Sequence, residues 1–158
     1  MTEKEIILIQ LEQAFNRKSW HGTNLLGAIR GIDPEEAAWR PANGRHNIWE
    51  IIVHTAYWKY SVYRRISGVD RGSFAISGSN WFRRPVENTL KELKKEVKLL
   101  KDYHQKLLDE VKSIDPRILN ETPAGSRSTY RDLIIGVAAH DLYHAGQIQL
   151  IKRLMQKD

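Results

Sequence analysis

Residues 138–148 read Ala138-Ala139-His140-Asp141-Leu142-Tyr143-His144-Ala145-Gly146-Gln147-Ile148. This segment carries two histidines four residues apart, and positions i and i+4 of an α-helix lie one above the other on the same face. Two imidazoles placed in this way can both reach one metal ion, so the spacing is a known signature of metal sites. We therefore take His140 and His144 as candidate metal ligands on a helix.

The two histidines also belong to the apolar stripe of that helix. Its members recur at steps of three and four residues, the period of a buried helical face: Leu133, Val137, His140, His144, Ile148, Ile151 and Met155. A buried imidazole without a hydrogen-bond partner or ligand costs about 1–3 kcal/mol. The alternative to a metal site is two core histidines that carbonyl or carboxylate groups satisfy.

The overall composition is that of one globular domain over residues 1–158. Hydrophobic residues make up 41% of the chain, and cysteine is absent, which removes disulfides and thiolate ligands and fits a reducing cytoplasm. The N-terminal residues lack the basic and apolar regions of a signal peptide, and no apolar run approaches the ~20 residues of a membrane span. We expect a cytoplasmic protein with no membrane partner.

The net charge of +6 does not by itself indicate a nucleic-acid partner. Many lysines lie in residues 91–112, but acidic residues alternate with them, and some are spaced to form ion pairs, such as Glu87 with Lys91 and Asp102 with Lys106. This pattern is typical of a solvated helix face rather than of a basic stripe. We expect no nucleic acid to bind.

Capping signals divide the first half of the chain into helices. Thr2 and Glu5 form a capping box that opens the first helix, which we expect to break at residues 20–22 and to resume as far as Gly31. A short helix follows Asp33, which precedes a proline suited to the first helical position.

A second capping pattern, Asn47 with Glu50, opens a helix that should end near Gly68. His54 lies three residues after Ile51 in this helix and four before Trp58, so it also falls on or beside the inward face.

Residues 68–84 show no sustained period and are long for a helix–helix connection, which usually spans 2–8 residues. A connection of this length either crosses the bundle, so that the flanking helices run parallel, or forms a lid over a site. The two explanations are compatible with each other. Its apolar residues need a surface to pack against: Phe74, Ile76, Trp81 and Phe82.

The third helix is expected from Pro85 to Asp115. His104 occupies a position on its apolar stripe and is read as a core or rim histidine, with a fourth ligand or a partner of the ligands as the alternative. Thr129 and Asp132 cap the last helix. Four main helices with two short connections and one long one predict an all-α four-helix bundle.

Two segments resemble the signature segments of the DinB-like family of damage-inducible bundle proteins. They are residues 46–54, His46-Asn47-Ile48-Trp49-Glu50-Ile51-Ile52-Val53-His54, with Ala56-Tyr57-Trp58 behind them, and residues 140–148. Residues 20–22 are similar to a third, weaker one. The resemblance spans nearly the whole chain and implies a bundle in up-down-down-up order, with the long crossover between helices 2 and 3. Members of the family are often homodimers.

The resemblance also implies a divalent metal ion, usually nickel or zinc, held by three histidines. One comes from the second helix and two from the fourth, which here gives His54, His140 and His144. Several relatives are thiol transferases or isomerases that use a low-molecular-weight thiol, and many have no assigned reaction.

The donor chemistry agrees with such a site. Three neutral imidazoles suit zinc, nickel, copper or iron rather than magnesium or calcium, and three protein ligands leave a coordination position open. Hydrogen-bond partners should fix the imidazole tautomers, and Glu50 and Gln147 are the candidates, with an ordinary surface or packing role as the alternative. On the long connection, Trp81, Arg83 and Arg84 are candidates for binding a substrate. Arg83 and Arg84 either meet its carboxylate or form an ordinary solvated pair.

The leading functional hypothesis is transfer or addition of a thiol to a small molecule, in which the metal ionises the thiol and no protein nucleophile is needed. Metal-dependent hydrolysis is an alternative, although the motif lacks the glutamate of H-E-x-x-H that acts as a general base. A metal-binding or sensing bundle without catalysis is the third reading, and the sequence does not separate it from the enzyme.

Overall fold

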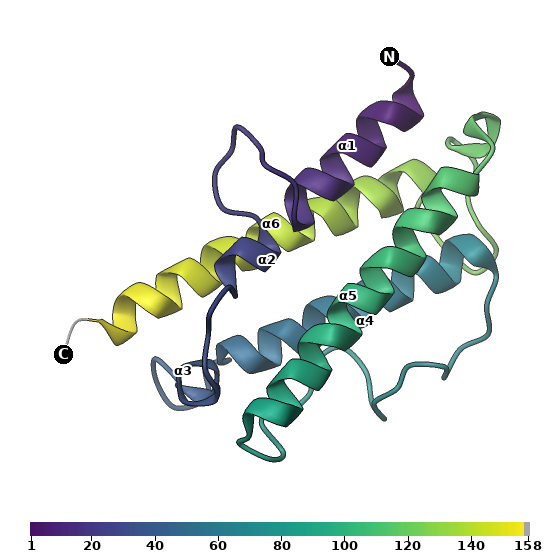
Figure 1. Cartoon of the computed structure of the whole chain (residues 1–158). Coiled ribbons are helices and arrows are strands. Elements are labelled where there is room, and N and C mark those ends of the chain that lie inside the picture. Colours follow the sequence, from purple (N-terminus) through teal and green to yellow (C-terminus); the bar gives the residue numbers. More distant parts are fainter. Residues whose placement is uncertain (157–158) are drawn as a thin grey trace.

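The computed structural model describes residues 1–156 and is helical, without strands, over that range (Figure 1). Its α-helices are α1 (Glu3–Phe15), α2 (Leu25–Ala28), α3 (Pro34–Ala38), α4 (Ile48–Ser67), α5 (Leu90–Ser113) and α6 (Tyr130–Met155). A short 3-10 helix, Pro116–Ile118, precedes α6. Within the described residues, no helix is both long enough and apolar enough to cross a membrane.

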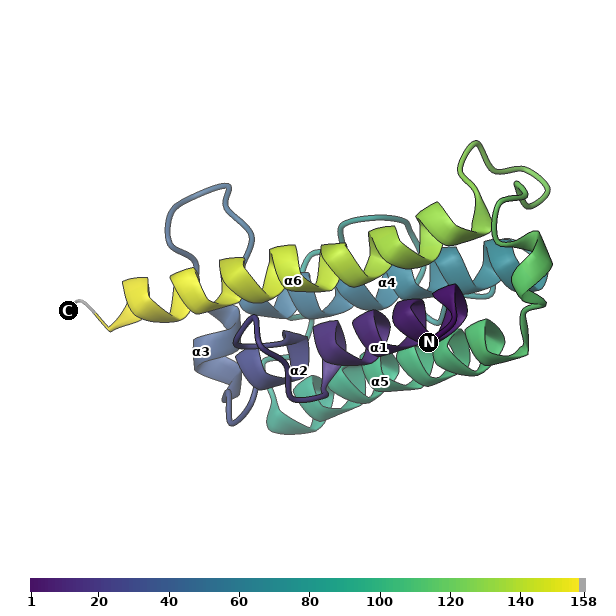
Figure 2. The ribbon, with the colours of Figure 1, turned by 90° about the horizontal axis from the view of Figure 1, so that it is seen from above.

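The four longest helices pack side by side. Helix α4 lies against both α5 and α6, and α1 lies against α6, while the short helices α2 and α3 pack against α6 and α4 (Figures 1 and 2). The two helices that carry the predicted metal ligands, α4 and α6, are therefore direct neighbours.

The predicted ends of α4 and the start of α6 are confirmed. The side chain of Asn47 accepts a hydrogen bond from the backbone N–H of Glu50 at 2.8 Å, and Thr129 accepts one from Asp132 at 3.1 Å. Helix α4 ends at Gly68, whose φ of 76° lies in the left-handed region that glycine adopts without strain. These caps set the register of the two helices that bring the histidines together.

Two predicted boundaries are wrong. Helix α1 ends at Phe15, and helical structure returns only in α2, so the first helix is not one broken rod that reaches Gly31. Helix α5 begins at Leu90 rather than at Pro85, because Thr89 caps its first turn by accepting from the N–H of Glu92 at 3.2 Å. A proline at the start of a helix is common, which made Pro85 the more obvious start. The connection between α4 and α5 therefore covers residues 68–89.

This connection packs its apolar side chains as expected. Phe82 is buried in the core cluster that the N-terminal half of α4 forms, and Phe74, Ile76 and Trp81 pack against the same cluster. The connection is thus held on the bundle surface rather than extended into solvent.

The core has two apolar clusters with a polar layer between them. The first cluster takes residues 48–56 of α4, and the second takes Val62 and Ile66 of the same helix. Between these segments lies Lys59, and the corresponding positions of α5 and α6 hold His104 and Asp141; all three are buried. A polar layer inside a bundle is costly unless its members are paired.

Candidate metal centre

Three histidines from two helices meet at one point. His54 comes from α4, and His140 and His144 come from adjacent turns of α6. The Nε2 atom of His140 lies 3.1 Å from that of His54 and 3.0 Å from that of His144. The possible ligand atoms of all three lie within 4.8 Å of one another. His54 and His144 are buried, and His140 is partly exposed.

The tautomers of two of these rings follow from their other nitrogen. Nδ1 of His54 lies 2.8 Å from the backbone carbonyl of Asn80, which can only accept a hydrogen bond, so this nitrogen carries the proton. Nδ1 of His144 likewise donates to the side-chain oxygen of Gln147 at 2.7 Å. The Nε2 atoms of His54 and His144 therefore present lone pairs, and both are directed at His140.

This donor set fits a divalent metal ion. With nitrogen–metal bonds of about 2.0–2.1 Å, two nitrogens on one ion lie about 3.0 Å apart at a right angle and about 3.4 Å apart at the tetrahedral angle. The observed separations of 3.0 and 3.1 Å are close to this range. Nδ1 of His140 is buried without a hydrogen-bond partner among the described residues, so no protein group fixes the tautomer of this third ring.

Burial keeps the three imidazoles neutral. It lowers the pKa of His54 to about 4 and that of His140 to about 3, and it also lowers the pKa of His144. The positive charge that His144 would carry lowers the first two pKa values further. Neutral imidazole is the form that binds metal, so the three rings are ready to bind at pH 7.

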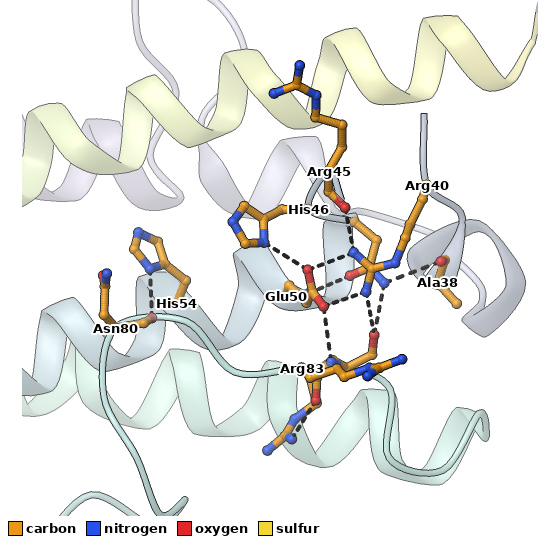
Figure 3. Close-up of polar contacts among 10 residues, drawn as sticks. Ala38, Arg40, Arg45, His46, Glu50, His54, Asn80 and Arg83 are labelled. Carbon is orange, nitrogen blue, oxygen red and sulfur yellow. Dashed lines mark hydrogen bonds and ion pairs between the residues drawn. The ribbon is translucent and has the colours of Figure 1, made fainter. Parts of the chain in front are cut away.

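The connection between α4 and α5 supplies a partner that the sequence analysis missed. Asn80 accepts from His54 through its backbone oxygen (Figure 3). Its side-chain oxygen accepts from Nε1 of Trp58 at 3.0 Å. Its φ is 62°, a left-handed conformation that asparagine tolerates better than most residues. In the sequence, the asparagine between Ser79 and an aromatic residue was the signal that could have suggested this role.

Gln147 hydrogen-bonds to His144, whereas Glu50 forms no hydrogen bond with His54, His140 or His144. Its carboxylate accepts from Arg40 at 2.5 and 3.0 Å, from Nδ1 of His46 at 2.9 Å and from the backbone N–H of Arg84 at 3.3 Å (Figure 3). Burial favours the neutral acid, but the hydrogen bonds from Arg40 and His46 lower the pKa of Glu50 to about 2.

Glu50 reaches the site indirectly, through a stack of rings. The ring of Trp81 lies between those of His46 and His54, with centroid separations of 3.5 Å and 3.8 Å and interplanar angles of 4° and 7°. Glu50 orients His46, His46 supports Trp81, and Trp81 covers one face of His54. The indole therefore lies directly on a predicted metal ligand.

The two arginines after Trp81 have different surroundings. Nε of Arg84 pairs with the carboxylate of Glu96 at 2.6 Å, and these side chains are 10% and 3% exposed, so Arg84 is engaged with α5. Arg83 is exposed and lines a hollow of about 390 Å³ together with Arg45 and His46.

His104 lies outside the three-histidine group. Its ring stacks on that of Phe15, with centroids 3.6 Å apart, and both ring nitrogens are buried without a hydrogen-bond partner among the described residues. Burial lowers its pKa to about 2. It belongs to the polar layer of the core, which is the first of the two interpretations that the sequence allowed for this position.

A buried ion pair next to the site was not predicted. Nζ of Lys59 on α4 lies 2.5 Å from a carboxylate oxygen of Asp141 on α6, and both side chains are fully buried. Burial raises the pKa of Asp141 to about 6, although the charge of Lys59 opposes this. Asp141 follows Val137 by four residues, so the helical period places Asp141 on the inward face of α6. That period could have revealed that its side chain is buried.

A family model described as the DinB superfamily matches residues 19–148, a range that includes all three histidines. Comparisons with curated proteins and with solved structures gave no match.

Proposed function

Because this chain belongs to the DinB superfamily, we propose that it is a metal-dependent enzyme in which His54, His140 and His144 hold one nickel or zinc ion. We propose further that it transfers a low-molecular-weight thiol to a small molecule. The observation that carries the proposal is the convergence of two imidazole lone pairs, one from each helix, on the partly exposed imidazole of His140.

A divalent ion with an open position supplies Lewis acidity, which favours the ionised form of a thiol at neutral pH. The protein contributes the remaining features. Asn80 and Gln147 fix the tautomers of His54 and His144, and the indole of Trp81 shields His54 from water on one face. Because the three ligands are neutral, an anionic group is favoured at the centre.

The surroundings of Glu50 favour thiol transfer over hydrolysis. Hydrolysis at a metal ion is helped by a general base near the ion, and Glu50 lies only one helical turn from His54. Its carboxylate already accepts hydrogen bonds from Arg40, His46 and Arg84, and its pKa is held at about 2. A carboxylate so well stabilised as an anion is a weak base. A thiol held at the metal would ionise near neutral pH and release its proton to solvent water, so this chemistry would need no such residue.

We infer that Arg83, rather than Arg84, meets a carboxylate of the substrate. Arg84 is paired with buried Glu96, so using it would leave an uncompensated charge in the protein. Arg83 and Arg45 line the hollow beside His46, which stacks on Trp81. Both faces of the Trp81 ring are covered by His46 and His54, so the substrate would pass the edge of this ring, with its acidic group in the hollow and its reacting end toward the histidines.

We also infer that the four long helices follow the up-down-down-up order. In Figure 1 the sequence colours run in one direction along α4 and α5 and in the opposite direction along α1 and α6. The connection over residues 68–89 is long enough to return along the bundle, which parallel neighbours require.

We further propose that the chain forms a homodimer through the outer face of α6. Exposed apolar side chains recur on this helix at Ile135, Tyr143, Leu150 and Leu154, which share one face at helical spacing. Light scattering during gel filtration should give a dimer for the parent and a monomer for Leu150→Glu. A parent protein that elutes as a monomer at high concentration would refute the proposed homodimer.

Turnover tests the proposed reaction. Protein loaded with nickel or zinc is mixed with cysteine, coenzyme A or glutathione and with a fluorogenic electrophile such as monochlorobimane. We expect metal-dependent conjugation with at least one thiol, which His140→Ala abolishes and His21→Ala, at an exposed histidine, does not. Thiol binding without conjugation would support the sensing alternative, and conjugation that survives metal removal would refute the proposal.

A further inference from the structure

A second polar pocket lies between α4 and residues 71–78 of the connection to α5. Its volume is about 360 Å³. Three arginines, Arg64, Arg65 and Arg71, line it together with aromatic and apolar side chains. None of the three histidines lines it, and Trp81 does not either, so it is a separate feature of the surface.

The pocket carries uncompensated positive charge. Its lining contains no aspartate or glutamate, and within the described part of the chain none of its arginines forms an ion pair. The guanidinium of Arg65 is held in place by the backbone and side-chain oxygens of Ser61. Burial and the charges of Arg64 and Arg71 lower the pKa of Arg65, as expected when like charges face one another.

The loop wall of this pocket is anchored rather than loose. The phenol oxygen of buried Tyr60 accepts the backbone N–H groups of Gly72 and Ser73 at 3.1 and 3.2 Å. Tyr103 of α5 donates to the carbonyl of Ser73 at 3.3 Å. The segment that carries Arg71 is therefore tied to both α4 and α5, which reduces the entropy lost when a ligand binds.

Part of the pocket lining is apolar. The rings of Tyr57 and Phe74 contact each other edge to face, with centroids 5.4 Å apart, and Ile76 also lines the pocket. A ligand that fits this lining has an acidic head for the arginines and an apolar or aromatic body for these side chains.

We propose that this pocket binds a small organic anion whose phosphate or carboxylate contacts Arg64, Arg65 and Arg71. Planar guanidinium groups bind such oxyanions through paired, charge-assisted hydrogen bonds, which suits both head groups. The aromatic body packs on Tyr57 and Phe74. The site is built without the histidines, so binding there does not depend on a metal ion or on the function proposed above.

The test is titration of the protein with phenyl phosphate and phenylacetate, followed by calorimetry and by the amide signals of Gly72, Ser77 and Gly78 in NMR spectra. We expect saturable binding of both, weaker binding of inorganic phosphate, and none of neutral benzyl alcohol. Arg64→Gln and Arg71→Gln should each weaken binding about tenfold or more, the loss typical of a charge-assisted hydrogen bond. Both arginines are at least partly exposed, so neither variant should unfold.

Two controls make the outcome specific. Arg127→Gln removes the same charge from an exposed site elsewhere and should leave binding unchanged, and His140→Ala should also leave it unchanged because the metal centre is not involved. Equal binding by Arg64→Gln, Arg71→Gln and Arg127→Gln would overturn the proposal. So would binding of benzyl alcohol as tight as that of phenyl phosphate, or loss of binding in His140→Ala.

Discussion

The three-histidine group and the Lys59–Asp141 pair are neighbouring polar features of one core, and they differ in how they are satisfied. Both join α4 to α6, and Asp141 directly follows His140. In the ion pair, opposite charges meet at 2.5 Å and compensate each other inside the protein. In the histidine group, the Nε2 lone pairs of His54 and His144 face His140, which as a neutral ring offers them at most one hydrogen.

This difference distinguishes the structural role of the ion pair from the metal-binding role proposed for the histidines. A paired buried charge fixes how two helices lie against each other, because any shift would leave a charge unpaired. Buried lone pairs that lack a hydrogen-bond donor in the same core indicate a site for a ligand. The pair thus positions α4 against α6, and the histidines use that position.

The largest expected effect comes from breaking the ion pair. Lys59→Met leaves Asp141 buried without a partner and should lower the free energy of unfolding by about 3–5 kcal/mol in urea titrations. The double variant Lys59→Met/Asp141→Leu should recover most of this loss. Lys98→Met, which breaks a largely exposed pair with Asp102, should cost about 0.5 kcal/mol or less. Similar losses for the two single variants would contradict the distinction drawn above.

The polar layer should also make stability depend on pH. His104 has a pKa of about 2 in the folded protein and about 6.5 in the unfolded chain, so between these values only the unfolded chain binds the extra proton. Its contribution is present above pH 6.5 and is lost as the pH falls, by roughly 3 kcal/mol at pH 4. Unfolding of metal-free protein across this range should show a smaller loss for His104→Phe than for the parent. Parallel curves would show that His104 does not carry the effect.

A smaller effect is expected at Gln147. Gln147→Ala removes the acceptor that fixes the tautomer of His144, and metal affinity should fall about tenfold while the fold stays intact. Gln149→Ala is the matched control, because Gln149 has no hydrogen bond to the three histidines in the described structure. Competition with a metal-binding dye measures both. Unchanged affinity in Gln147→Ala would mean that the tautomer is fixed by other means.

The smallest effect is expected at Trp81. Trp81→Leu removes the ring that stacks on His54, and such ring pairs contribute about 0.5–1.5 kcal/mol, so metal affinity should fall a few-fold. Trp20→Leu, at a fully exposed tryptophan, should change nothing. A metal affinity that rises in Trp81→Leu would indicate that the connection blocks the site rather than supporting it.

The helices that carry the site were predictable because their signals are local. Caps such as Asn47 and Thr129 act within one helical turn, and the stripe through His140 and His144 repeats at the helical period. His54 also fell on an inward face by its spacing. The family resemblance then joined it to the other two histidines.

The remaining features depend on contacts far apart in the sequence. Asn80 lies 26 residues from the histidine it orients, and nothing local predicts where an irregular connection will cross a helix. Glu50 was predicted to orient His54 because of their helical spacing. In the structure, Arg40 and His46 from the preceding loop donate hydrogen bonds to the carboxylate of Glu50 instead. The partner of Lys59 lies on another helix, so a lone charge within an apolar pattern was not enough to predict the pair.

The most direct test of the central claim is the metal affinity of His54→Ala, measured by competition and compared with the parent and with His21→Ala. If ligands from α4 and α6 share one ion, His54→Ala should bind nickel or zinc at least about a hundredfold more weakly, beyond the loss usual for a partner of a ligand. The parent and His21→Ala should bind one ion per chain with equal affinity. If His54→Ala binds as tightly as the parent, the two helices do not share an ion and the proposed centre is wrong.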